Sequence, residues 1–112
     1  MIFPAFPTLK NLPEPPYFAA IFISERSDNL DGYDEMDQAT LEAVQDIPGY
    51  LGFVSLKEGN KGVFISYWNS PAAIELWRKN AMHRSAKEMG KKQWYSRYIS
   101  QLCEIVQHGT KL

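Results

Sequence analysis

The stretch GVFISYWNSPAAIELWRKNAMH, residues Gly62 to His83, decides the fold of this chain. Val63–Trp68 is rich in β-branched and aromatic residues, which predicts a strand. Asn69-Ser70-Pro71 predicts a helix start, because serine caps the first turn and proline suits the first helical position. The stretch holds two of the three tryptophans and one of the two histidines, so the flanking segments are expected to pack around it.

The preceding segments predict two more strands and a helix. Tyr17–Glu25 and Tyr50–Lys57 have the composition of strands, and a hairpin loop joins the second of them to the central stretch. Gly32–Ile47 has apolar residues at helical spacing, and Asp28 or Asp31 is expected to cap it.

The segments that follow complete the order of elements. The helix that starts at Pro71 is expected to bend near Asn80 and to continue over Ala81–Trp94, with Gly90 weakening it. Tyr98–Gln107 predicts a fourth strand. The resulting order, βαββαβ, is typical of an α+β ferredoxin-like protomer, an antiparallel sheet with its helices on one face.

Two of the predicted strands are apolar on both faces. Tyr17–Glu25 is apolar at nearly every position, and the central strand carries Val63 and Ile65 on one side and Phe64 and Trp68 on the other. A sheet with one solvated face would alternate polar and apolar residues. We therefore expect two sheets to pack face to face in a homodimer, a dimeric α/β barrel.

The 112 residues predict one folded domain with two short ends. Residues 1–16 hold five of the seven prolines and are expected to form an extended arm. Residues 17–108 form the domain, and residues 109–112 form a short tail.

Charge and cysteine content restrict the partners and the compartment. The net charge is −1, which gives no reason to expect nucleic acid as a partner, and no stretch is long and apolar enough for a membrane span. Acidic residues gather between Asp28 and Asp46 and basic residues between Arg84 and Arg97, which we interpret as two solvated helix faces. The alternative is subunit steering, or an anionic ligand near the basic segment. The single cysteine, Cys103, fits a cytoplasmic location.

Seven short motifs form a recognisable series along the chain. They are Tyr17–Arg26, Pro48–Gly52, Ser66–Ser70, Ala73-Ile74, Trp77–Ala81, His83 and Lys92–Tyr95. Together they resemble the antibiotic biosynthesis monooxygenase (ABM) family of dimeric α+β barrels over residues 17 to 107. The resemblance implies a dimer and a pocket between sheet and helices in each protomer. Characterised members include monooxygenases that oxidise polycyclic aromatic substrates without metal or flavin, and heme-degrading enzymes.

His83 is the candidate catalytic residue, because histidine can accept a proton near neutral pH. The resemblance also places a histidine six residues after a tryptophan, here Trp77. The alternative is a structural histidine that holds the bend between two helix segments. Trp77 and Trp68 are candidates for the pocket wall, with core and dimer packing as the alternative.

Oxygenation without a cofactor requires an apolar, water-poor cavity with a few polar groups. Asn80, Asn69, Tyr67 and Tyr98 are candidates for those polar groups, with helix capping and buried phenols as alternatives. Phe22 and Phe53 are further candidates for the pocket. No cofactor is expected, and no metal either, since the two histidines and one cysteine lack ligand spacing.

Three functions remain open from the sequence. The first is a cofactor-independent monooxygenase that acts on a small aromatic or electron-rich molecule. The second is a non-catalytic dimeric module that binds a small ligand or serves as a stress-related accessory protein. The third, heme binding or degradation, is weaker: the heme-degrading relatives have a histidine further beyond the tryptophan, where this chain has Lys87 ten residues after Trp77.

Overall fold

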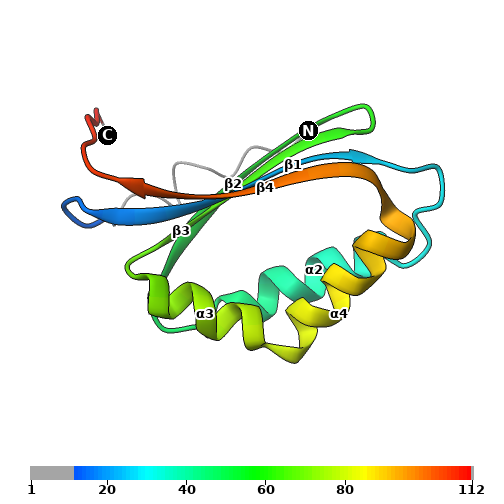
Figure 1. Ribbon diagram of the computed structural model, residues 1–112, viewed down its shortest axis with the longest axis horizontal. Helices are drawn as coiled ribbons and strands as arrows, with labels where there is room; N and C mark the ends of the chain where they lie inside the picture. Colours follow the sequence, from blue (N-terminus) through cyan, green and yellow to red (C-terminus); the bar gives the residue numbers. More distant parts are fainter. Residues whose placement is uncertain (1–11, 112) are drawn as a thin grey trace.

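A computed structural model describes residues 12–111 and shows one sheet covered by helices on one face (Figure 1). The elements are β1 Tyr17–Arg26, α2 Tyr33–Val44, β2 Tyr50–Glu58, β3 Lys61–Trp68, α3 Pro71–Lys79, α4 Ala81–Met89, the π-helical segment η1 Gly90–Trp94, and β4 Tyr95–Ile105. The predicted βαββαβ order is confirmed, with the second helix divided into pieces. The first eleven residues of the proline-rich arm lie outside the described part.

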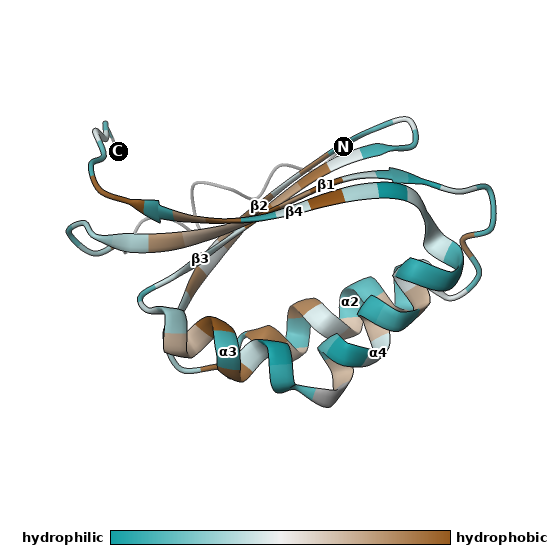
Figure 2. Cartoon of the chain, viewed as in Figure 1, coloured by the Kyte–Doolittle hydropathy of each residue, from teal (hydrophilic) through white to brown (hydrophobic). Residues whose placement is uncertain are grey.

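The sheet has the strand order β2-β3-β1-β4, and all three neighbouring pairs are antiparallel. Helices α2, α3 and α4 cover the same face of this sheet, as predicted (Figure 1). Figure 2 shows hydrophobic residues gathered on the strands and on α3, whereas α4 is more hydrophilic. Among the described residues, no helix is long and apolar enough to cross a bilayer.

The core lies at one end of the layer between sheet and helices. It consists of Val44, Trp68, Ala73, Ile74 and Trp77, from α2, β3 and α3. Trp68 is the most buried of these, with 1% of its surface exposed, and its indole N–H donates a hydrogen bond of 2.8 Å to the Ser66 hydroxyl. The rest of the layer, toward α4, holds the cavity described below.

The prediction that an aspartate caps α2 was wrong. Gly32 is the N-cap residue, with φ of 79°, and no side chain in the described part of the chain caps the helix. The backbone carbonyl of Asp31, the residue before the cap, accepts a 3.0 Å hydrogen bond from the indole N–H of Trp94. Gly32 suits the cap because it has no Cβ to clash in the left-handed conformation.

The last strand begins three residues earlier than predicted. The helical segment before it reaches Trp94, as predicted, but changes from α-helix to π-helix after Met89. The chain changes from α4 to η1 at Gly90, where a side chain would lie 2.9 Å from the Tyr95 ring. Trp94 is buried at 4% exposure, and its carbonyl accepts a hydrogen bond of 2.8 Å from the backbone of Ser27. These contacts with the segment after β1 fix the turn, so β4 pairs with Arg26 already at Tyr95.

Candidate functional site

The strand register defines the sheet surface beneath the helices. Three rows cross this surface in the order β2, β3, β1, β4: Lys57–Gly62–Ser24–Tyr98, Ser55–Phe64–Phe22–Ser100 and Phe53–Ser66–Ala20–Leu102. The middle row is a ridge of two phenylalanines with a serine at each end. The rows on either side have small residues at their centres, which leaves room above the sheet.

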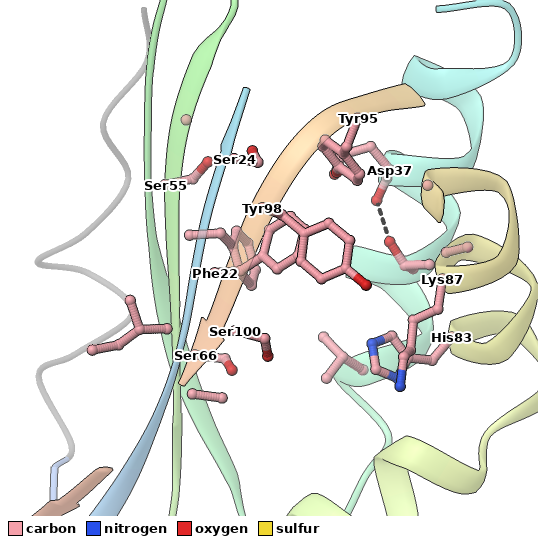
Figure 3. A pocket seen from close by; sticks show the side chains of 18 of the residues that line it. Phe22, Ser24, Asp37, Ser55, Ser66, His83, Lys87, Tyr95, Tyr98 and Ser100 are labelled. Carbon is pink, nitrogen blue, oxygen red and sulfur yellow. Dashed lines mark hydrogen bonds between the residues drawn. The ribbon is translucent and has the colours of Figure 1, made fainter. Parts of the chain in front are cut away.

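A cavity of about 530 Å³ lies between this surface and the helices. Its helical wall includes Tyr33 and Asp37 from α2, Trp77 from α3, and His83 and Lys87 from α4. Figure 3 shows Ser24, Ser55, Ser66 and Ser100 along the sheet side of the cavity and His83 and Lys87 on the opposite side. Such a volume is in the range of small-molecule sites.

The break between α3 and α4 places His83 against Trp77. The side-chain oxygen of Asn80 accepts hydrogen bonds from the backbone N–H groups of Met82 at 2.9 Å and His83 at 3.3 Å. This cap starts α4 after the bend that the sequence predicted, with His83 in its first turn. The imidazole stacks on the Trp77 indole with a centroid distance of 4.6 Å and an interplanar angle of 18°.

The environment of His83 favours its neutral form. Its Nδ1 atom is buried and forms no hydrogen bond with any described residue. Burial lowers the pKa of His83 to about 4, and the positive charges of Lys87 and Arg78 act in the same direction, whereas a hydrogen bond with the backbone of Trp77 opposes them. The imidazole is therefore uncharged at neutral pH, and in the empty site it is a weaker base than an ordinary histidine.

Aromatic side chains surround the sheet end of the cavity. Phe22 contacts Tyr95 with a centroid distance of 5.0 Å and Tyr98 with one of 5.3 Å. Tyr98 extends from β4 into the space between sheet and helices (Figure 3). Burial, together with the neighbouring Tyr33, raises the pKa of Tyr95, so that this phenol keeps its proton and can donate a hydrogen bond.

The structure brings five of the predicted site residues together. His83, Trp77, Trp68, Phe22 and Tyr98 all line the cavity.

Four other candidates from the sequence lie elsewhere. Asn80 caps α4, and Phe53 stacks on Phe64, with a centroid distance of 5.5 Å, outside the cavity lining. Tyr67 is on the opposite face of the sheet, with its ring 6.3 Å from that of Tyr17. Asn69 is exposed, and its backbone N–H donates to the carbonyl of Gly49 at 2.8 Å.

Sequence reasoning missed the serines that line the cavity. Ser24, Ser55 and Ser100 come from three strands and become neighbours of one space only through the sheet register. One local pattern pointed to two of these serines. On β1 and on β4 an aromatic residue and a serine lie two positions apart, and therefore on the same face of the strand: Phe22 with Ser24, and Tyr98 with Ser100. Lys87 is exposed, as expected for a solvated helix face, and it also borders the cavity next to His83.

The sequence model of the family described as "Antibiotic biosynthesis monooxygenase" matches residues 16–89, more than half of the chain. The chain belongs to this family. The resemblance found in the sequence motifs is therefore confirmed. A relative in sequence is the uncharacterized protein YqjZ of Bacillus subtilis (strain 168). It is 40% identical over 98 residues, which cover 87% of this chain and 86% of YqjZ.

Solved structures with the same fold include a cofactor-independent oxygenase. This protein, a single-residue mutant of SnoaB from Streptomyces nogalater, has a TM-score of 0.71 at 12% identity, and the match covers 84% of this chain and 97% of SnoaB. Rv0793 from Mycobacterium tuberculosis has a TM-score of 0.73 at 10% identity, with coverage of 84% and 99%. At these identities the likeness shows the ABM fold alone.

Proposed function

We propose that this ABM protein is a cofactor-independent monooxygenase that oxidises a small, electron-rich aromatic molecule. The observation that carries the proposal is the cavity in which a half-buried, neutral His83 stacks on Trp77 opposite Phe22. Membership in the ABM family supports the reaction class, and the fold shared with SnoaB is consistent with it.

In the proposed reaction, His83 accepts the proton of a phenolic hydroxyl and leaves an electron-rich phenolate. The phenolate transfers one electron to molecular oxygen, and the resulting superoxide and aryloxyl radical combine at a ring carbon. The peroxide formed takes up the proton from His83. Cleavage of the O–O bond and loss of the ring hydrogen as a proton release water and leave a quinone. One oxygen atom enters the product, the other becomes water, and the substrate supplies all the electrons.

The cavity surface suits this chemistry. The aromatic walls hold a flat ring and keep water away from the peroxide, which would otherwise decompose. The phenol of Tyr95 keeps its proton because of burial, and the hydroxyls of Ser24, Ser55 and Ser100 border the same space. These groups are candidates for donating hydrogen bonds to the oxyanion that forms on the substrate.

Oxygen uptake by the purified protein tests the proposal. We expect the protein, treated with a chelator and free of flavin, to consume one molecule of oxygen per molecule of quinone formed from a naphthol or anthrone. A rate equal to that of the protein-free solution, for every phenol and quinol tried, would remove the enzyme function. Binding of these compounds without turnover would favour a ligand-binding module instead.

We also propose that two copies of the chain associate through the outer sheet face. A continuous apolar row, Leu56–Val63–Ile23–Ile99, crosses all four strands there. Ile23 and Ile99 are 41% and 57% exposed in the single chain, and burying such a face is favourable. Static light scattering should give twice 12.8 kDa for the wild type and a smaller mass for Ile99→Lys. A wild-type monomer at micromolar concentration would contradict the proposed dimer.

A further inference from the structure

The cavity is strongly basic, although the chain as a whole has a net charge of −1. The basic residues on its lining are Arg26, Lys57, Arg78, Lys87 and Lys91. Among the described residues, the lining has one carboxylate, Asp37, which lies 3.6 Å from the Lys57 ammonium. The excess of positive charge is therefore local to this site.

The five basic residues differ in how they are engaged with the rest of the fold. Arg26 donates a hydrogen bond to the carbonyl of Gly59, and Arg78 lies 3.7 Å from the carboxylate of Glu75. Lys87 and Lys91, by contrast, form no ion pair within residues 12–111. They are four residues apart, one turn along the segment from α4 into η1, so their like charges repel each other. A bound anion would relieve that repulsion.

We propose that the cavity takes an aromatic carboxylate, whose ring lies between the Phe22 ridge and Trp77 and whose carboxylate binds Lys87 and Lys91 beside His83. The inference rests on the proposed function in taking this cavity as the substrate site. The walls supply the apolar surface for the ring. The two lysines supply the positive charges for the carboxylate. They line the cavity from the same helical segment as His83.

The carboxylate also has a consequence for His83. The imidazole shares the cavity with Lys87 and Lys91 of its own helical segment, Arg78 of α3, Asp37 of α2, and Tyr95 and Tyr98 at the start of β4. The neighbouring cations oppose its protonation in the empty site. A substrate carboxylate next to Lys87 offsets the repulsion between the lysine and a protonated His83, and so increases the proton affinity of His83. This increase comes with substrate binding, at the stage when the substrate hydroxyl must lose its proton. A base is more effective when its pKa is nearer the working pH.

Calorimetric titration with two probes that differ by one carboxylate tests the binding mode. The probes are 6-hydroxy-2-naphthoate and 2-naphthol, and the titrations are made without turnover, under nitrogen. We expect the naphthoate to bind about tenfold more tightly than the naphthol at low salt, with a preference that declines as salt is added. The variant Lys87→Met/Lys91→Met should lose the preference and keep its affinity for 2-naphthol.

Lys92→Met is the matched control, because Lys92 is an exposed neighbour of Lys91 that does not line the cavity. It should bind the naphthoate like the wild type. Equal affinity of the wild type for both probes would overturn the proposal, and so would a loss in Lys92→Met as large as in the double variant.

Titration of the histidine signals by nuclear magnetic resonance gives a second readout. The chain has two histidines, and His108→Gln identifies the signal of His83. The pKa of His83 should rise when 6-hydroxy-2-naphthoate is bound and stay unchanged with 2-naphthol; no rise with the naphthoate would contradict the coupling.

Oxygen uptake is measured separately. A carboxylate preference without uptake would reject the oxygenase alone, and uptake without a preference would reject the carboxylate site alone.

Discussion

Replacing His83 with alanine should lower kcat for aromatic oxidation by about 100-fold or more, the usual contribution of a positioned general base. The substituted protein loses the one imidazole on the cavity lining among the described residues, and with it the acceptor for the substrate proton. Substrate affinity should change little, because Trp77 and Phe22 still supply the aromatic walls. Oxygen uptake at saturating substrate measures kcat, and calorimetric titration under nitrogen measures binding.

The pKa of His83 should determine how kcat/KM falls at acid pH. Because the pKa of His83 in the free protein is lowered to about 4, the neutral base persists well below its usual range. The value of kcat/KM should therefore fall only as the pH approaches that pKa. His108→Ala is the control, since His108 lies on the other face of the sheet, where its Nδ1 atom is hydrogen-bonded to the Tyr17 hydroxyl at 3.0 Å. Equal rates in His83→Ala and wild type would rule out the catalytic role.

Trp68→Ala should reduce the free energy of unfolding by about 3–5 kcal/mol, as expected when a large aromatic side chain is removed from a core. Trp68 is 1% exposed, packs among Val44, Ile74 and Trp77, and satisfies its indole N–H with Ser66. The substitution leaves a void and removes the partner of a buried hydroxyl. Because small domains are stable by only about 5–15 kcal/mol, the loss should be evident in urea unfolding.

Leu76→Ala provides the comparison for this effect. Leu76 is on α3, near the same core, but it is 52% exposed. Its removal should cost about 0.5 kcal/mol or less, as for most surface positions. Similar losses in the two variants would show that the core does not lie where the structure places it.

Much of the fold could be predicted from local sequence. The two-sided apolar pattern of Val63–Trp68, the Ser70-Pro71 helix start and the break at Asn80 all arise from residues close together in the chain. The start of β4 could not be predicted this way, because it depends on Trp94 bonding to the carbonyl of Asp31, 63 residues away. The prediction for the cap of α2 was wrong because the helix begins at Tyr33, which makes Gly32, and not an aspartate, the N-cap residue.

The aromatic residues of the site and its histidine could be predicted from the sequence. The spacing from Trp77 to His83, together with the ABM resemblance, indicated a wall and a candidate base, and the structure stacks their rings. The serines of the sheet surface depend on register between strands that are distant in sequence, so no local pattern assembles them. Lys87 belongs to the basic segment for which the sequence left both a solvated helix face and an anionic ligand open. It is exposed, and only the position of α4 over the sheet shows that it also borders a cavity.

The most direct test of the proposed oxygenase is isotopic labelling with oxygen-18 gas. The purified protein, freed of metal and flavin, would be incubated with a naphthol or anthrone, beside His83→Ala and a protein-free control. We predict one labelled oxygen atom in each quinone molecule and the second in water, with formation of the labelled product strongly reduced in His83→Ala. Product that carries no label, or that forms no faster than in the protein-free control, would contradict the account.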